Sequence, residues 1–400
     1  MNSRITVPAL AFLLVLPSSL SAQPAVSVED RLARLEASLA RIERQLSQTV
    51  SADELSPALK ELSDLEHQLG YDGKTPLNVV KTAGVETKLA LGGFVQANYE
   101  SGTAPDARWA GINDRFLLRR ARLSATGAFA ENFSFKFESD FGNNSLAAKT
   151  GLSGQLTDAF LAWAKYPAAS VKLGQFKTPF GYEQLLPDTK IFTIERSLPN
   201  DKLTQGRQIG AMLFGDVADK RVSYSVGAFD GTGVNISSND NQKFMWVGRA
   251  GVVALDSKAA GQKFKISTST NYFTTIDKGT FNGRREGWGV DTQIVFGPAE
   301  IDAEWLRNDS HPIVGRPTAA AGWALLGALN FSAHWQGIAR YETFDSNTLL
   351  PGTTTNLWTY GVNYLIRGDD LKLSLDYLSG SQPVPAPHGD RVIGRLQVMF

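Results

Sequence analysis

From residue 89 to the C-terminus, the sequence repeats segments in which apolar and polar side chains alternate. Successive side chains of a β-strand point to opposite faces, so this period of two predicts strands with one apolar and one polar face. The pattern defines sixteen predicted strands, at 89–100, 115–129, 132–142, 156–166, 169–176, 207–217, 220–230, 243–255, 263–274, 287–296, 299–308, 321–331, 333–343, 354–366, 370–379 and 390–400. A chain with sixteen such strands must cover sixteen apolar faces.

The connections between these segments alternate between short and long. AEN at 130, PAA at 167, ADK at 218, GPA at 297, SA at 332 and RGDD at 367 are short, and the connection at 256 is somewhat longer. The others span about ten to thirty residues. A transmembrane barrel sorts its connections in this way, with short periplasmic turns and longer external loops. A large soluble β-sandwich is the alternative, but sixteen strands with a polar face are too many for a two-sheet core. The predicted fold is an all-β, sixteen-stranded antiparallel transmembrane β-barrel.

Aromatic residues and the last strand agree with this fold. Seven of the eight tryptophans fall on the apolar face of their strands: Trp163, Trp246, Trp288, Trp305, Trp323, Trp335 and Trp358. Aromatic rings favour the membrane interface. In the terminal RVIGRLQVMF, the apolar face is expected to meet lipid and the polar face an aqueous lumen. Pairing the last strand with the first leaves no open edge in hydrocarbon.

The N-terminal part is organised differently. Residues 1–22 form a predicted signal peptide, with Arg4 before a short apolar run. Within 27–70, apolar residues at heptad spacing predict a periplasmic helical coiled coil, for which a single amphipathic helix is the alternative. A linker at 71–88 and the barrel at 89–400 complete the predicted domains.

The sequence offers no pattern for catalysis. It has no Cys, its four His are scattered, and neither HExxH nor GxSxG occurs. The 40 basic and 40 acidic residues cancel, which does not favour a nucleic-acid partner. We therefore expect no enzyme, no cofactor and no metal.

The longest connection, at 177–206, is too apolar for a solvent-exposed loop, because it carries Phe180, Leu185, Ile191, Phe192 and Ile194. We expect this third external loop to fold back into the barrel and narrow the lumen.

Several stretches resemble one family. GGFVQANY, LLRRARLSATG, FKFESDF, TDAFLAWAKY, VKLGQFKTPFGYEQ and TIERSL followed by GRQIGAMLFGD are similar to the phosphate-selective porins of the O and P type. The resemblance implies a homotrimeric outer-membrane channel that is surrounded by lipid and passes small anions such as phosphate. The terminal Phe400 resembles the signal read by the barrel-assembly machinery.

Eight residues are candidates for the pore and for anion binding. The resemblance carries over to Arg119, Arg120, Lys172 and Asp140. Strand phase adds Arg122 and Lys136, and the loop adds Lys177 and Arg196. Arg119 is out of phase with Arg120 and Arg122, so a β-bulge or a position near a loop is needed to turn it into the lumen.

Selectivity stays open at this stage. Phe94 stands where a phosphate-selective relative can have arginine, and the fifth external loop offers only Lys278, Arg284 and Arg285. The charges in lumen phase show no basic excess. Passive diffusion of small anions, with phosphate or related oxyanions favoured, is the predicted function. The alternatives are a general or cation-preferring porin of the same fold, and a structural barrel that tethers the envelope.

Overall fold

A computed structural model describes residues 79–81, 88–130, 132–143, 146, 154–259, 261–279 and 281–400. The predicted signal peptide at 1–22, the predicted coiled coil at 27–70 and most of the predicted linker at 71–88 lie outside these residues. Asn78–Phe400 form one compact unit.

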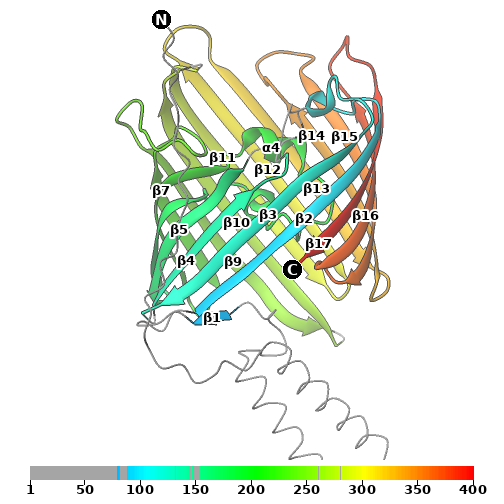
Figure 1. Ribbon diagram of the computed structural model, residues 1–400. Coiled ribbons are helices and arrows are strands. Elements are labelled where there is room, and N and C mark those ends of the chain that lie inside the picture. The colour runs from blue at the N-terminus through cyan, green and yellow to red at the C-terminus, as the bar shows by residue number, and fades with distance from the viewer. Residues whose placement is uncertain are drawn as a thin grey trace, which may run out of the picture. The chain divides into compact units, whose positions relative to one another are not determined.

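Sixteen antiparallel strands form a closed barrel (Figure 1). They are β2 (Lys88–Gly102), β3 (Arg115–Phe129), β4 (Phe133–Asp140), β5 (Gln155–Tyr166), β6 (Ala169–Lys177), β7 (Arg207–Val217), β8 (Val222–Phe229), β9 (Met245–Ala259), β10 (Gln262–Asp277), β11 (Gly283–Phe296), β12 (Ala299–Pro312), β13 (Thr318–Asn330), β14 (Trp335–Asp345), β15 (Thr354–Arg367), β16 (Leu371–Ser381) and β17 (Gly389–Met399). β17 closes the barrel against β2, with Met399 opposite Phe94 and Arg395 opposite Asn98. A short strand, β1 (Val79–Lys81), pairs with the start of β2. The predicted sixteen-stranded barrel is confirmed.

Several connections between strands are shorter than the sequence pattern predicts. β10 begins three positions after β9 ends, so the connection predicted at 256 is a tight turn. On the opposite rim, the loops that connect strands between β10 and β17 are shorter than predicted, at 278–282, 313–317, 346–353 and 382–388. The hydrogen-bonded ladder continues through residues that are polar on both faces, such as Arg285 opposite Ser310. Hydrophobic alternation is lost in such segments, although backbone pairing is not.

The two faces of the wall differ as the alternation requires. Of the seven tryptophans assigned to the outer face, six are exposed on the isolated barrel and Trp163 is half-buried. The lumen face carries polar and charged side chains that are mostly buried. The eighth tryptophan, Trp109, does not lie on a strand. It is fully buried in the 3-10 helix η1 (Ala107–Trp109) of the first long loop. Within the described residues, no helix is long and apolar enough to cross a bilayer.

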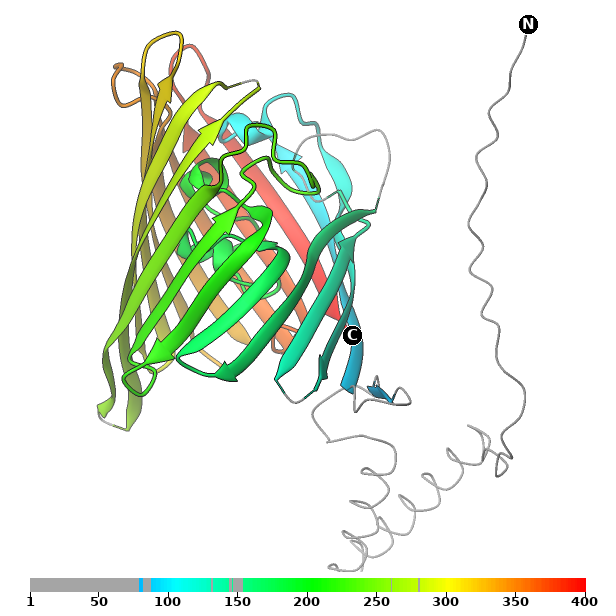
Figure 2. The same ribbon diagram turned by 90° about the vertical axis from the view of Figure 1, so that its left-hand side faces the viewer.

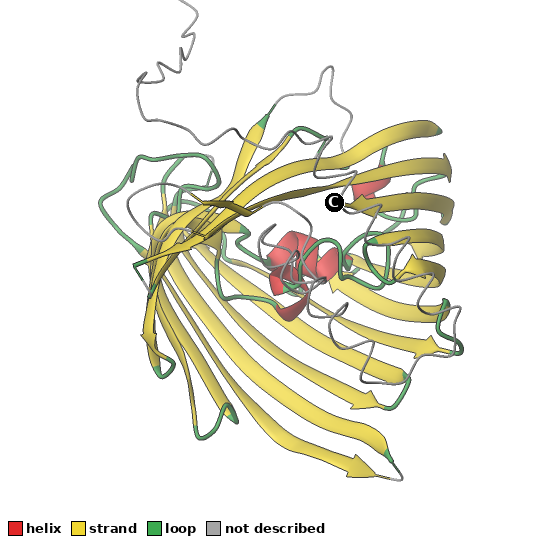
Figure 3. Cartoon of the chain, turned by 60° about the horizontal axis from the view of Figure 1, so that its bottom comes forward, coloured by secondary structure: helices red, strands yellow, loops and turns green. Residues whose placement is uncertain are grey.

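The loop between β6 and β7 lies inside the ring of strands (Figure 3). This loop, residues 178–206, is called L3 below. It contains two short helices, α3 (Tyr182–Leu185) and α4 (Leu198–Leu203). Ser197 caps α4 by accepting a hydrogen bond from the Asn200 backbone N–H at 3.3 Å, which is a common helix start. α4 packs on the inner faces of β12, β13 and β14.

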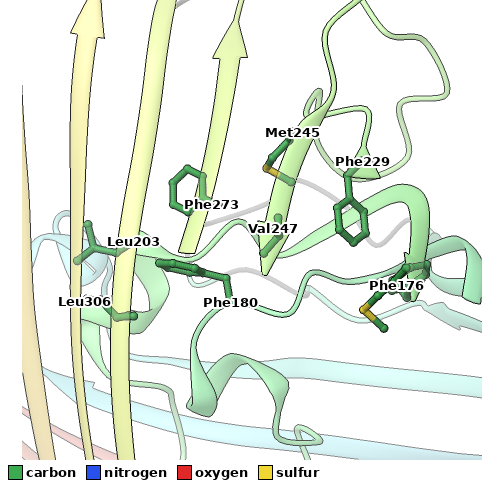
Figure 4. Packing of buried hydrophobic residues seen from close by; sticks show 9 residues of the cluster. Phe176, Phe180, Leu203, Phe229, Met245, Val247, Phe273 and Leu306 are labelled. Carbon is green, nitrogen blue, oxygen red and sulfur yellow. The ribbon is translucent and has the colours of Figure 1, made fainter. Parts of the chain in front are cut away.

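Apolar side chains near both ends of L3 fix it to the wall (Figure 4). Phe180 meets Phe273 of β10 edge to face, with ring centroids 4.9 Å apart. Leu203 and Leu306 belong to the same buried cluster. These contacts account for the apolar composition of L3, since the loop has a hydrophobic surface to cover inside the barrel.

Candidate functional site: the lumen around the third loop

Two carboxylates of L3 bind an arginine cluster on the barrel wall. Glu195 accepts hydrogen bonds from Arg119 Nε at 2.8 Å and Nη2 at 3.0 Å, a bidentate pair. Arg395 of β17 donates to the same carboxylate at 2.7 Å. Burial by itself raises the pKa of Glu195, but Arg119, Arg395 and Arg120 together outweigh it and hold that pKa below its usual range. Glu195 is therefore a fixed negative charge.

Asp188 is the second anchor of L3. Its carboxylate lies 2.6 Å from Arg122 Nη1, 2.5 Å from Arg196 Nη1 and 3.4 Å from Arg120 Nη2. Burial raises its pKa, yet the charges of Arg120, Arg196 and Arg122 hold the pKa of Asp188 well below the usual value. We call Glu195, Asp188 and their arginine partners the L3 clamp.

A β-bulge turns Arg119 toward the clamp. Gln96 of β2 pairs with Arg120 and the next residue, Ala97, pairs with Leu118, so Arg119 is the extra residue on β3. Such a bulge re-aims a side chain that the strand period would direct outward. Arg119 and its neighbour Arg120 thus both point into the lumen, where both are buried.

The remaining bonds of these arginines are also internal. Arg120 donates to the Gln96 side chain at 2.8 Å, and Arg122 pairs with Asp140 at 2.8 Å. Arg196 donates to the backbone carbonyls of Glu183 and Leu186. Five of the eight candidate residues, namely Arg119, Arg120, Arg122, Asp140 and Arg196, therefore lie in one network that holds L3. In this network, the guanidinium groups are paired with carboxylates of the protein itself.

The opposite wall of the lumen is acidic, and L3 covers part of it. Glu304 of β12 accepts from the Tyr182 backbone N–H and from Asn200 Nδ2, at 2.8 Å for the latter. Arg340 of β14 lies 3.2 Å from Glu183 of L3. Burial, followed by the charges of Asp302 and Glu300, raises the pKa of Tyr182 above its usual value. Asp302 and Glu300 face the lumen beside these contacts.

Two open cavities lie on the basic side of L3. The larger, about 710 Å³, is bounded by β4–β9 and by Pro179 and Leu185 of L3. The smaller, about 410 Å³, lies beside it along β2–β5 and shares Lys136, Asp158, Lys177 and Leu185 with the first. Seven basic residues line the two cavities: Arg122, Lys136, Lys172, Lys177, Arg207, Lys220 and Arg249. Four acidic residues line them: Glu138, Asp158, Asp188 and Asp216.

The three candidate lysines border these cavities. Lys136 is paired with Glu138 at 2.9 Å and with Asp158 at 2.8 Å. Lys177 donates to the Leu186 carbonyl at 2.6 Å. Lys172 has neither a hydrogen bond nor an ion pair among the described residues, and its Nζ lies 4.4 Å from the ring centroid of Phe160. Lys172 is therefore the candidate cation most available to a solute.

Some residues that line the lumen were not identified from the sequence. Phe160, Met212 and Phe214 point into the lumen, although strand phase predicted a polar surface there. The sequence did contain a signal for them, because each is an apolar residue at a strand position that faces the lumen. Arg207, 2.7 Å from Asp158, occupies the first position of β7, where the preceding loop sets the side-chain direction.

The closed sixteen-stranded barrel, its alternating faces and the loop inside it define an outer-membrane porin. The sequence matches the family model for phosphate-selective porin O and P over residues 89–400, so the chain belongs to this family. The resemblance seen in the sequence is thereby confirmed.

Solved structures share the fold at low sequence identity. The outer membrane channel DcaP of Acinetobacter baumannii is 14% identical with a TM-score of 0.60, and the match covers 81% of this chain and 100% of that one. The anion-selective porin from Comamonas acidovorans is 13% identical with a TM-score of 0.60, covering 79% and 100%. The trimer form of OmpT, an outer membrane protein of Vibrio cholerae, is 9% identical with a TM-score of 0.57, covering 78% and 99%. No curated protein matches the sequence.

Proposed function

We propose that this porin is a passive channel that prefers small anions, phosphate and related oxyanions included. The observation that carries the proposal is the lining of the two cavities beside L3, with seven basic residues against four acidic ones. A local excess of Lys and Arg along the path is what favours anions in a pore. The chain as a whole, with 40 basic and 40 acidic residues, has no such excess.

Lysines rather than the arginine pair carry the contacts in this proposal. Arg119 and Arg120 are bonded to L3 and buried, whereas Lys172 and Lys177 lack a carboxylate partner among the ion pairs of the described residues. A compact ammonium that is hydrated in the pore gives the weak, repeated contacts that conduction needs. We place the anion path along Lys136, Lys172 and Lys177.

Reversal potentials in planar bilayers test the proposal. Across a potassium chloride gradient, the wild type should be more permeable to chloride than to potassium. Lys172→Ala should lower this preference because an accessible charge is lost. Arg120→Ala should also lower it, by less, since Arg120 acts through the L3 clamp. If neither variant changes the potential, both residues are removed from the mechanism.

A general or cation-preferring porin is the second candidate, and the acidic wall favours it. Glu300 and Asp302 face the lumen without an ion pair among the described residues. If the wild-type reversal potential favours potassium, this wall and not the basic one lies on the ion path.

We also propose a homotrimer, embedded in outer-membrane lipid, with the N-terminal segment in the periplasm. β4 and β8 have only 8 residues each, whereas β9–β13 have 13 to 16 (Figure 2). Eight residues at the tilt of a barrel strand rise about 20 Å, less than the apolar band of about 25 Å. This low wall exposes Phe137, Leu161 and Leu173. Burial against a second copy would remove the mismatch.

Deleting residues 27–70 tests the role of the N-terminal segment. We expect trimers of this variant to dissociate at a lower detergent concentration or a lower temperature than wild-type trimers, while inserted channels still conduct. Loss of conductance in a correctly inserted variant would contradict this assignment. Recognition of Phe400 by the barrel-assembly machinery belongs to the same proposal. Phe400 pairs with Gly93 through two backbone hydrogen bonds of 2.8 and 3.0 Å and leaves its ring exposed.

A further inference from the structure

The larger cavity contains an aromatic cluster that a polar pore does not require. The lumen of a transmembrane barrel is normally polar, because it is filled with water. Here Phe160 of β5, Phe176 of β6 and Phe214 of β7 lie around the ammonium of Lys172. The distances from Lys172 Nζ to the three ring centroids are 4.4, 5.3 and 5.4 Å.

The aromatic cluster is held in place from behind. Phe176 is almost fully buried and meets Phe229 at 5.4 Å and Phe160 at 6.1 Å, both edge to face. Figure 4 shows Phe176 and Phe229 within the apolar cluster that also anchors L3. Phe160 and Phe214 are only half-buried, so they have apolar surface left to offer. The rings form a fixed wall of the cavity.

The ammonium group of Lys172 at this wall is available to bind an anion. Lys172 has no acceptor for its three N–H donors among the described residues, and the ring contacts satisfy its charge without using those donors. Ser223 and Ser225 of β8 line the same cavity. Their hydroxyl groups make no side-chain hydrogen bond within the described part of the chain. The ammonium and these hydroxyl groups are thus hydrogen-bond donors that a carboxylate in the cavity can use.

These features separate two kinds of anion. A small inorganic anion gains from Lys172 but must approach apolar rings that cannot hydrate it. An organic anion gains from the same charge and also covers its apolar body against Phe160 and Phe214. Burying about half of a phenyl ring, roughly 60 Å² of apolar surface, strengthens binding by about tenfold.

We propose that the cavity around Lys172 is a subsite for small organic anions that carry an aromatic ring and a carboxylate. This inference rests on the proposed anion preference and narrows it to a solute class. The carboxylate binds at Lys172, and the ring packs against Phe160 and Phe214.

Block of the chloride current by added anions tests the subsite in reconstituted channels. The probes are benzoate, acetate and phosphate, since acetate has the carboxylate without the ring. We expect wild-type channels to be half-blocked by benzoate at about one tenth of the acetate concentration, and by phosphate only at higher concentration than benzoate. The ratio of the acetate and benzoate values does not depend on the number of channels.

Variants locate the effect. Phe160→Leu and Phe214→Leu keep an apolar side chain but remove the ring, and each should move the ratio toward one. Lys172→Met should weaken block by benzoate and by acetate alike. Leu325→Ala is the matched control, because Leu325 of β13 is exposed on the outer face and lies outside the low wall. Its ratio should remain that of the wild type.

The outcomes separate this inference from the proposed function. A wild-type ratio near one in a chloride-preferring channel overturns the aromatic subsite and leaves the anion preference standing. A ratio that falls as much in Leu325→Ala as in Phe160→Leu also overturns it, since benzoate would then act through the membrane. A reversal potential that favours potassium contradicts the proposed function itself.

Discussion

The two walls of the lumen carry opposite charge, and L3 covers them unequally. On the acidic wall, Glu304 is bonded to both helices of L3, and Arg340 is tied to Glu183. On the basic wall, Lys136 and Lys172 border open cavities. A channel with balanced charge can therefore still present one sign to its solutes, because a folded loop decides which wall they meet.

Removal of L3 should have the largest effect on this difference. Replacing residues 182–203 by a short Gly-Ser linker opens the lumen and uncovers Glu304 and Asp302. Conductance should rise at least roughly twofold, and chloride preference should fall, as expected for a wider pore with mixed charge. Single-channel currents and reversal potentials measure both. Unchanged conductance would mean that L3 does not limit the path.

The L3 clamp should matter next. Glu195→Gln leaves Arg119 and Arg395 buried without their carboxylate, a change that costs about 3–5 kcal/mol in comparable buried pairs. We expect L3 to detach intermittently and open-channel current noise to increase. Asp201→Asn is the control, because Asp201 is half-exposed and 3.9 Å from Lys202. If the open-channel current noise of Glu195→Gln equals that of the wild type, apolar contacts alone hold the loop.

The clamp should resist mild acid. The pKa values of Glu195 and Asp188 are lowered in the fold, so their contribution is complete above the ordinary carboxylate range and is lost only as pH falls through the lowered values. Wild-type current noise should stay constant from pH 7 to about pH 5. Noise that grows within that window would contradict the assignment of these charges.

Neutralising single carboxylates should give the smallest and most specific effects. Asp158→Asn removes a negative charge from both open cavities and leaves Lys136 and Arg207 with Glu138 as their remaining carboxylate partner, so chloride preference should increase. Asp302→Asn on the acidic wall should change it less, because L3 separates that wall from the path. Comparison of the two reversal potentials checks this order. An equal or larger effect of Asp302→Asn would place ions on the acidic side.

Strand-level features were accessible from the sequence because they depend on local rules. The alternation predicted all sixteen strands and the outward tryptophans, and the phase conflict at Arg119 predicted the need for a bulge. The strand ends and loop lengths were less accessible. Beyond the membrane, polar residues such as Arg285 continue the ladder without any hydrophobic signal.

The same distinction between local and long-range features applies to the candidate site. The sequence could list Arg119, Arg120 and Lys172 as basic residues near the lumen, but it could not say which of them remains available. That depends on Glu195 and Asp188, which lie 76 positions from Arg119 and 66 positions from Arg122 along the chain. No local pattern encodes such pairs.

The sequence by itself determined the closed barrel, since a period of two over sixteen segments leaves a chain no other way to satisfy both its backbone and its apolar faces in a membrane. The tertiary structure decided what the pore presents to a solute. The path of L3 across the lumen is fixed by contacts between residues distant in sequence, and those contacts bury Arg119 and Arg120 and leave Lys172 accessible.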